Sequence, residues 1–356
     1  FGQCLMFAMS FFWLLQKGIT LTNITNSIFY SSSLISSILL LNIGRNWPDV
    51  ILKIEEIETT LPPLKGNVAK YCKITMLFIF ISAVVEHLLS LFYGVTVATA
   101  CDKDNVTKTF FIYHMPWTFD YTPYALWKGI LAEMFNIQST FMWSFNDLLL
   151  MSISIYLTEH FILHNELLKE AVKQNNFSVQ DFRVQYLKIV RLVRIVNGQT
   201  GIYILNSFGS NLYWICTQLF FSLNKTQTGH FVCSKSLSFR FLEREVLKYI
   251  YFFRAIHGIE HTIYFTYSFS FIVTRTLLVL LLAARIHSNS IEPLIVLYGL
   301  PSEKFDIEVE RYISQIKNMK VALSGLDFFY VTRTMILTLL GTIVTYELVM
   351  LQFNNN

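Results

Sequence analysis

Long apolar segments recur along this chain of 356 residues, and they constrain its fold more than any other feature. A helix that crosses a bilayer needs about 20 predominantly apolar residues. The composition agrees, because 53% of the residues are hydrophobic and 15% are charged, whereas soluble domains carry about 25% charged residues. We therefore predict an all-α membrane protein, a bundle of seven transmembrane helices, in the apolar runs 1–16, 26–44, 72–100, 125–163, 199–223, 256–284 and 326–353.

These apolar runs differ in length and in the number of polar residues that interrupt them. The first begins at Phe1 and is short for a span, so we expect the start of the first helix to be missing. The fourth run is too long for one bilayer and should project beyond the membrane. Isolated polar residues interrupt the runs, which favours a bundle with a hydrated interior over separate lipid-facing anchors. The net charge of +4 is small and spread out, so it gives no sign of a nucleic-acid partner.

The distribution of basic residues predicts an orientation. Segments 45–73, 159–198 and 285–333 together hold 17 Lys and Arg residues, and segments 17–25, 98–130 and 223–256 hold 10. Loops rich in Lys and Arg stay on the cytosolic side of a membrane. The sequence therefore predicts a cytosolic amino terminus and an external carboxyl terminus. The segment 302–319, which falls on the cytosolic side, alternates charged and apolar positions in the manner of an amphipathic helix.

Possible covalent modifications fall mostly on the predicted external side. The glycosylation pattern Asn-x-Ser/Thr occurs there at Asn23, Asn105 and Asn224, and once on the cytosolic side at Asn176. Cys101 and Cys233 lie in polar external segments and could pair, but spacing alone does not establish a disulfide.

The last apolar run carries a mildly polar stripe. Steps of three and four residues place its members on one helix face: Thr334, Thr338, Thr342, Thr345, Val349 and Gln352. Small hydroxyl residues often join helices inside a membrane bundle. The alternative is a pore lining, formed by several copies of the helix around an axis.

The end of this run resembles a known receptor family. "GTIVTYELVMLQF", from Gly341 to Phe353, resembles the carboxyl-terminal signature of insect gustatory receptors, and the longer stretch from Ala322 looks most like their fructose-receptor branch. Other segments are similar to the same family in the third, fourth and fifth predicted helices: "AVVEHLLS", "FMWSFNDLLLMSISI" and "LNSFGSNLYWICTQLF".

The resemblance implies a ligand-gated, non-selective cation channel of four identical subunits in the plasma membrane of a sensory neuron. By this resemblance the last helix of each subunit lines a central pore, with its constriction at Gln352 and Phe353 and with Thr342, Thr345 and Val349 on the pore wall. Glu347 lies off the stripe and is interpreted as a packing group paired with a basic residue, with a selectivity ring as the alternative. The implied organisation is a ligand-binding bundle (1–284), a cytosolic anchor region (285–325) and a pore helix (326–356).

A sugar is the ligand class that the resemblance implies. Sugars bind in partly apolar cavities, where hydroxyl groups meet polar side chains and C–H surfaces meet aromatic rings. Polar and aromatic residues in the outer half of the predicted bundle are the candidates: Glu86, His87, Trp127, Glu133, Gln138, Asn211, Trp214, Gln218, Tyr264 and Tyr267. Asn146, Asp147 and Trp143 lie deeper, where they are expected to hold the fourth helix to its neighbours.

Two other classes of protein compete with this interpretation. A seven-helix G-protein-coupled chemoreceptor would have its amino terminus outside and would carry Asp-Arg-Tyr and Asn-Pro-x-x-Tyr motifs, which this sequence lacks. "HGIEH", from His257 to His261, matches a zinc-peptidase pattern, but no third acidic ligand follows it at a suitable distance. We predict that the protein is not an enzyme and uses no metal or other cofactor.

The predicted orientation can be tested on intact cells. An epitope added after Asn356 should be labelled without permeabilisation, because the basic segments place the carboxyl terminus outside. An epitope in the segment 174–178 is the matched control and should be labelled only after permeabilisation. The opposite pattern of labelling would overturn the orientation.

Overall fold

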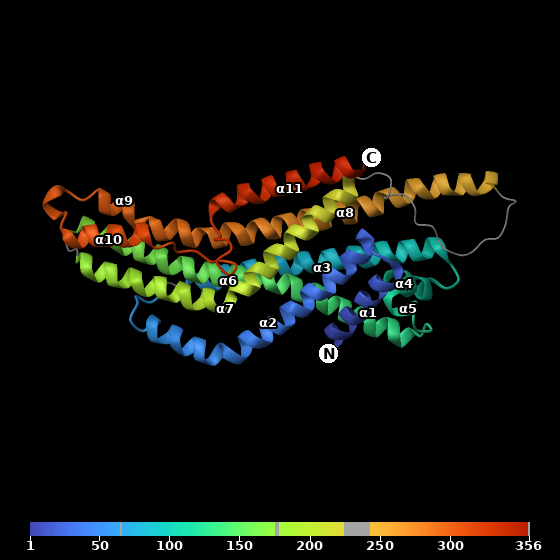
Figure 1. Cartoon of the computed structure of the whole chain (residues 1–356), viewed down its shortest axis with the longest axis horizontal. Coiled ribbons are helices and arrows are strands. Elements are labelled where there is room, and N and C mark those ends of the chain that lie inside the picture. The colour runs from blue at the N-terminus through green and yellow to red at the C-terminus, as the bar shows by residue number, and fades with distance from the viewer. Residues whose placement is uncertain (65, 175–177, 224–242, 355–356) are drawn as a thin grey trace.

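The computed structural model describes residues 1–64, 66–174, 178–223 and 243–354. Within these residues the regular structure is helical, apart from a single β-bridge between Ser324 and Tyr330. The long helices run side by side along the long axis of the molecule (Figure 1). Each apolar run of the sequence overlaps a long helix of its own: α1 (Gly2–Lys17), α2 (Leu21–Glu58), α3 (Asn67–Cys101), α6 (Leu126–Lys173), α7 (Val179–Leu223), α8 (Glu243–Ile291) and α11 (Arg333–Asn354).

Shorter helices cover the two ends of this bundle. At one end lie α4 (Val106–His114) and α5 (Pro116–Phe119), and at the other lie α9 (Pro293–Tyr298) and α10 (Ile307–Asn318) (Figure 1). A short 3₁₀ helix, Ser302–Lys304, precedes α10. The carboxyl-terminal ends of α2, α6 and α8 and the amino-terminal ends of α3, α7 and α9 lie toward the α9 and α10 end (Figure 1). The three basic segments of the sequence therefore include helix ends at one end of the bundle, and the side of the membrane that this end faces stays a prediction.

Helix length and composition support a membrane protein. Within the described residues, three helical stretches are long and apolar enough to cross a bilayer: Asn23–Glu58, Asn67–Cys101 and Glu260–Tyr298. In α6, buried polar side chains such as Asn146, Asp147 and His160 interrupt the apolar sequence. Polar groups of this kind face the interior of a membrane bundle. The total of seven spans stays a prediction.

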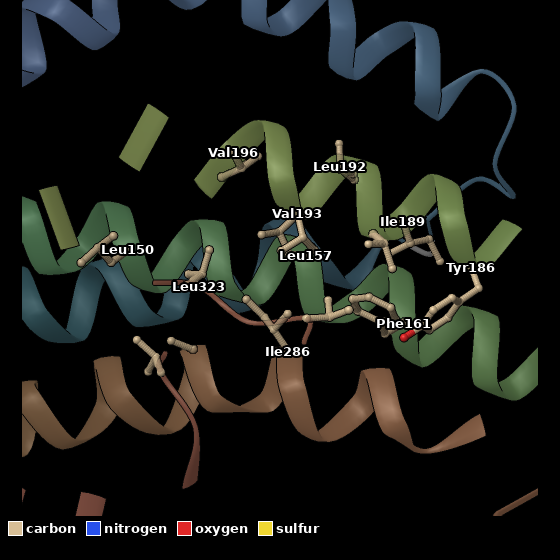
Figure 2. Packing of buried hydrophobic residues seen from close by; sticks show 14 of the residues in the cluster. Leu150, Leu157, Phe161, Tyr186, Ile189, Leu192, Val193, Val196, Ile286 and Leu323 are labelled. Carbon is tan, nitrogen blue, oxygen red and sulfur yellow. The ribbon is translucent and has the colours of Figure 1, made fainter. Parts of the chain in front are cut away.

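The largest hydrophobic core lies toward the α9 and α10 end. It includes Leu157 and Phe161 of α6, Tyr186 of α7 and Ile286 of α8, all buried between the helices (Figure 2). The amphipathic helix α10 joins this core with its apolar face, which buries Val309, Tyr312, Ile313 and Ile316. Asp306 begins α10 by accepting hydrogen bonds from the backbone amides of the first turn. The alternating pattern of segment 302–319 thus serves packing within one subunit.

The loop 319–332 connects α10 to α11 and is tied to α7. Asn197 donates to the hydroxyl of Ser324 at 2.9 Å and accepts from the Ser324 amide at 2.7 Å. Leu326 and Asp327 adopt positive φ angles, and the Phe329 ring lies where a side chain on Gly325 would be. Phe329 also packs edge-on against Phe208, with ring centroids 5.8 Å apart. The start of the last helix is therefore fixed to α7 by both hydrogen bonds and packing.

Candidate ligand cavity and last helix

A cavity of about 950 Å³ opens in the bundle toward the α4 and α5 end. Its wall combines aromatic rings with polar side chains, and this combination is typical of sites for small polar ligands. Rings come from Trp13, Phe29, Tyr30, Tyr113, Trp117, Trp143, Trp214 and Tyr264. Polar groups come from Asn26, Glu86, His87, Ser90, Asp102, Asn105, Lys108, Thr109, His114, Asn136, Thr140, Gln218 and Ser268.

The aromatic part of the wall is a continuous set of packed rings. Trp214 of α7 lies between Phe29 of α2, with centroids 6.1 Å apart, and Trp143 of α6, at 5.5 Å. Tyr30, whose ring centroid is 5.1 Å from that of Phe29, packs edge-on against Trp117 at 5.5 Å. Because these rings brace one another, their faces are held in place before any ligand arrives.

A row of hydrogen bonds crosses the cavity wall between three helices. Ser268 of α8 donates its hydroxyl to a carboxylate oxygen of Glu86 on α3, at 2.9 Å. Gln218 of α7 donates its amide to the same hydroxyl at 3.3 Å. This row fixes the amide and the carboxylate relative to the rings, so the wall presents donors and acceptors in a set geometry.

The candidate residues from the sequence fall into three groups. Glu86, His87, Trp214, Gln218 and Tyr264 line the cavity together. Glu133 lies behind the wall beside His87, Asn211 is buried below it, and Tyr267 donates its hydroxyl to the Ser82 carbonyl. Trp127, which is 64% exposed, and Gln138 lie on the outer surface of α6 and away from the cavity.

One side of the cavity comes from a segment that the sequence analysis treated as a loop. Helices α4 and α5 close the outer side with residues such as Tyr113, His114 and Trp117. The run of aromatic residues in "FFIYHMPWTF", 110–119, was the available signal, because a solvated loop rarely carries so many rings.

Of the two cysteines in the predicted external segments, Cys101, which precedes α4, takes part in a disulfide bond. Cys233 lies outside the described residues.

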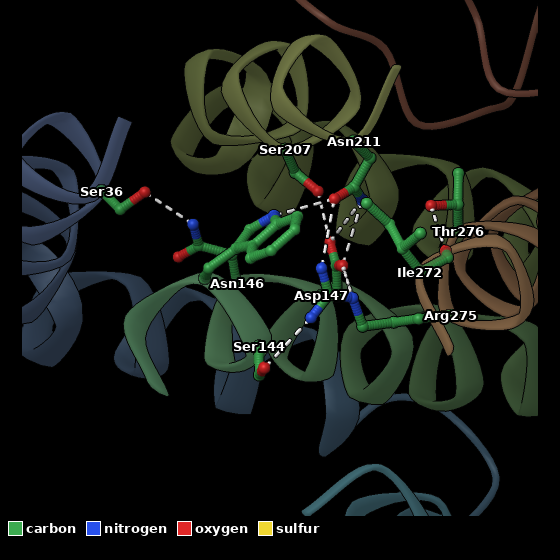
Figure 3. Close-up of polar contacts among 10 residues, drawn as sticks. Ser36, Ser144, Asn146, Asp147, Ser207, Asn211, Ile272, Arg275 and Thr276 are labelled. Atoms are coloured by element: carbon green, nitrogen blue, oxygen red, sulfur yellow. Dashed lines mark hydrogen bonds and ion pairs between the residues drawn. The ribbon is translucent and has the colours of Figure 1, made fainter. Parts of the chain in front are cut away.

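A buried ion pair lies directly beneath the cavity. The guanidinium of Arg275 on α8 is 2.7 Å from a carboxylate oxygen of Asp147 on α6, and the two side chains are 1% and 0% exposed. Asp147 also accepts hydrogen bonds from Ser207 and Asn211 of α7, while Arg275 donates to Ser144 (Figure 3). The pair therefore joins α6, α7 and α8.

Trp143 separates this ion pair from the cavity. Its ring lines the cavity and covers the Arg275 guanidinium at 4.2 Å from the ring centroid. Its indole N–H donates to Asn211 at 2.9 Å. The sequence analysis assigned Asp147 and Trp143 to helix packing but did not identify Arg275 as their partner. A lone arginine inside an apolar run was the available signal, because charges in such runs are paired in the bundle interior.

The last helix turns its threonine stripe away from its own subunit. Met335, Ile336 and Leu339 of α11 pack against the core of the bundle. Thr334, Thr338, Thr342 and Thr345 are exposed. The hydroxyls of the last three donate to backbone carbonyls one turn earlier, so their oxygen lone pairs are available as acceptors. Among the described residues, these threonines therefore do not join helices of one subunit, and their role as a pore lining stays a prediction.

The remaining residues singled out in the last helix lie near its carboxyl-terminal end. Val349 and Gln352 are exposed on α11, and the side chains of Glu347 and Phe353 lie outside the described residues.

Of the glycosylation patterns, Asn105 is exposed at the rim of the cavity. Asn23 is 7% exposed and donates its amide to the Gly18 carbonyl, an arrangement that disfavours a glycan there. Asn224 lies outside the described residues.

The fold and the cavity define a helical membrane protein with room for a small polar ligand. The chain belongs to the trehalose receptor family of insect gustatory receptors, whose sequence pattern matches residues 2–253 and 233–356. Membership of this family identifies the protein as a receptor and not an enzyme.

Individual relatives agree with this assignment. The chain is 29% identical over 358 residues to the Drosophila melanogaster "Gustatory receptor for sugar taste 64f", covering 98% of the chain and 70% of that protein. It is 29% identical over 336 residues to "Gustatory receptor 5a for trehalose" from the same organism, covering 92% and 69%. Among solved structures, the insect olfactory receptor OR5 from Machilis hrabei has the same fold, with a TM-score of 0.59 and 17% identity over 98% of this chain and 88% of that one.

The ion pair predicts a strong asymmetry between single and double variants. Arg275→Met leaves a buried carboxylate without its partner and should cost about 3–5 kcal/mol of folding free energy. Asp147→Leu combined with Arg275→Met removes both charges and should recover much of the loss. Surface expression and the monodisperse fraction after detergent extraction measure the effect. Arg285→Met, an exposed position on the same helix, is the matched control and should behave as wild type. Normal expression of the single variant would contradict the structural role.

Proposed function

We propose that this protein is a taste receptor in which a sugar, bound in the cavity, opens a non-selective cation channel. The observation that carries the proposal is the cavity wall, where the rings of Trp143, Trp214 and Tyr264 line the same cavity as the row of Glu86, Ser268 and Gln218. Rings can cover the C–H faces of a sugar, and the amide and carboxylate can bond its hydroxyl groups. The names of the relatives, which refer to sugar taste and to trehalose, support the same ligand class.

Fructose is the sugar that the sequence resemblance favours, and it stays a prediction. The relatives named above refer to trehalose or to sugar taste in general. A cavity of about 950 Å³ has room for a monosaccharide or a disaccharide. A panel of fructose, glucose, sucrose and trehalose tested on the same channel would rank them.

In the proposed channel, four copies of α11 surround a central pore. The threonine stripe faces away from its own subunit, so four subunits can turn it toward a common axis. Hydroxyl oxygens would then replace part of the hydration shell of a passing cation. Gln352 and Phe353 would form the constriction at the outer end. In this organisation residues 1–284 bind the ligand, 285–325 anchor the subunits in the cytosol and 326–356 form the pore of a receptor in the plasma membrane of a sensory neuron.

Gating requires a difference in sugar affinity between two states. A ligand shifts an equilibrium only by as much as it binds one state more tightly than the other. The sugar must therefore bind the open state better than the closed state. The contacts of α7 with both the cavity and the loop that leads into α11 offer a route for this difference.

The direct test is electrical recording from the purified protein in a planar bilayer. Current evoked by a sugar would establish that receptor and pore reside in one protein. Sugar binding without current, measured on the same preparation, would instead favour a receptor that signals through a G protein.

Truncation of the cavity wall should weaken the response to sugar. Trp214→Ala removes a ring face, and Gln218→Ala removes an amide. A lost hydrogen bond to a neutral hydroxyl costs about 0.5–1.5 kcal/mol, so each variant should raise the half-maximal sugar concentration about 2- to 13-fold. Trp127→Ala is the matched control, because Trp127 is exposed and away from the cavity. Unchanged dose–response curves at normal surface expression would place the sugar elsewhere.

Substitutions at the constriction should change the pore. A fourfold ring repeats each change four times, and an apolar constriction blocks ions by excluding water. Phe353→Ala should leak cations without sugar, and Gln352→Ala should alter conductance or ion selectivity. Thr345→Val should act in the same way but more mildly. Glu347→Gln should affect expression or assembly instead of selectivity. Leu340→Ala, on the face opposite the stripe, is the control for single-channel recording. A Phe353→Ala channel that stays closed at rest, with Gln352→Ala unchanged, would place the constriction elsewhere.

A further inference from the structure

Three ionisable side chains from three helices meet at the wall of the cavity, where His87 and His114 line the cavity and Glu133 lies behind them. A carboxylate oxygen of Glu133 on α6 lies 3.6 Å from the imidazole Nε2 of His87 on α3. The other oxygen lies 4.0 Å from Nε2 of His114 on α4. All three side chains are largely buried. The carboxylate is thus placed between two histidines that approach it from different helices.

The contacts within this cluster are longer than hydrogen bonds. An N–H···O hydrogen bond spans about 2.7–3.2 Å, so neither histidine reaches Glu133 closely enough. Among the described residues, Nε2 of His87 and Oε2 of Glu133 have no hydrogen-bond partner. Asn136 approaches the other oxygen of Glu133 at 3.5 Å. Burial makes incomplete hydrogen bonding costly, so the cluster would gain free energy from any change that brings a donor closer to Glu133.

One member of the cluster belongs to a short helix that forms part of the cavity wall. Lys108, Thr109, Tyr113 and His114 of α4 all line the cavity. Inside α4, His114 stacks on Phe110, whose ring occupies the space beside Gly94 of α3. The position of His114 relative to Glu133 is therefore linked to the position of α4 against α3 and α6, and so to the width of the cavity.

We propose that His87, Glu133 and His114 form a proton-binding site on the cavity wall, and that protonation draws α4 toward α3 and α6 and weakens sugar binding. The proposal rests on the proposed function, since it concerns regulation of the same cavity.

Charge explains the direction of the effect. A neutral imidazole has one N–H, whereas a protonated imidazole has two and a positive charge. A charge-assisted N–H···O bond is about 2.7–2.9 Å long, shorter than either distance in the cluster. Protonation of either histidine therefore favours a tighter arrangement. Burial lowers the pKa of His114, although the Glu133 carboxylate opposes this effect. The tighter arrangement should gain stability as the pH falls through the mildly acidic range.

Other ionisable groups face the same cavity wall or cluster. Among the described residues they come from α2, α3, α4, α8 and the segment after α3: Tyr30, Glu86, Tyr93, Asp102, Lys108, Tyr113, His261 and Tyr264. Histidine is the side chain that ordinarily changes charge between pH 5 and 8. His261, which packs against Tyr93 at 5.4 Å, is thus the comparison residue for the two histidines of the cluster.

Sugar dose–response curves at pH 7.5 and pH 5.5 test the proposal. In the wild type, the half-maximal sugar concentration should rise about 3- to 10-fold at pH 5.5, which requires a pKa difference of at least about half to one unit between the sugar-free and sugar-bound states. Glu133→Gln keeps the shape of the side chain but removes its charge, so this variant should lose the pH dependence. His114→Gln should reduce it, and His261→Gln should retain it.

Hydrogen exchange provides a readout that does not depend on sugar or current. The backbone amides of α4 should be better protected at pH 5.5 than at pH 7.5 in the wild type, after correction for the intrinsic effect of pH. Glu133→Gln should show no such difference. Equal protection at both pH values would overturn the proton site even if sugar evokes a current. Absence of sugar-evoked current at pH 7.5 would count against the proposed function alone, because the exchange experiment would still decide the proton site.

Discussion

The ion pair between Asp147 and Arg275 is the interaction on which the arrangement of the central helices depends. Two charges inside a membrane bundle cost several kcal/mol each unless they are paired and hydrogen-bonded. Ser144, Ser207 and Asn211 add hydrogen bonds to this pair, so its stabilisation depends on the relative positions of α6, α7 and α8. Trp143 seals the pair from the cavity above. The floor of the cavity is therefore held by electrostatics and not by apolar packing alone.

Helix α7 connects the parts of the molecule that the proposed function requires. In its outer half it contributes Trp214 and Gln218 to the cavity wall. One to two turns further in, Asn211 and Ser207 bond to the ion pair. Toward the other end, Asn197 holds the loop that leads into α11. A displacement of α7 by a bound sugar would thus act on both the ion pair and the start of α11.

The two ends of the bundle differ in how densely their buried side chains are packed. Toward α9 and α10, large side chains such as Phe161, Tyr186 and Tyr312 are fully buried in one apolar core. Toward α4 and α5, the helices instead enclose a cavity and a cluster of polar groups whose hydrogen bonds are incomplete. Local stability follows the density of buried apolar contacts. Ligand-dependent movement is therefore expected at the cavity end, while the other end keeps the subunit intact.

The sequence by itself determined the helical membrane class, the positions of the long helices and the family, because apolar run length and a terminal motif are local properties. It also selected Trp214, Gln218, Glu86 and Tyr264 by residue type. It did not separate them from Trp127 and Gln138 of α6. The sequence does not show which face of α6 turns toward the bundle until the neighbouring helices are placed. Only the tertiary structure paired Arg275 with Asp147 and brought α4 over the cavity. Such contacts join residues far apart in the chain, and no local pattern records which buried charge will meet which partner.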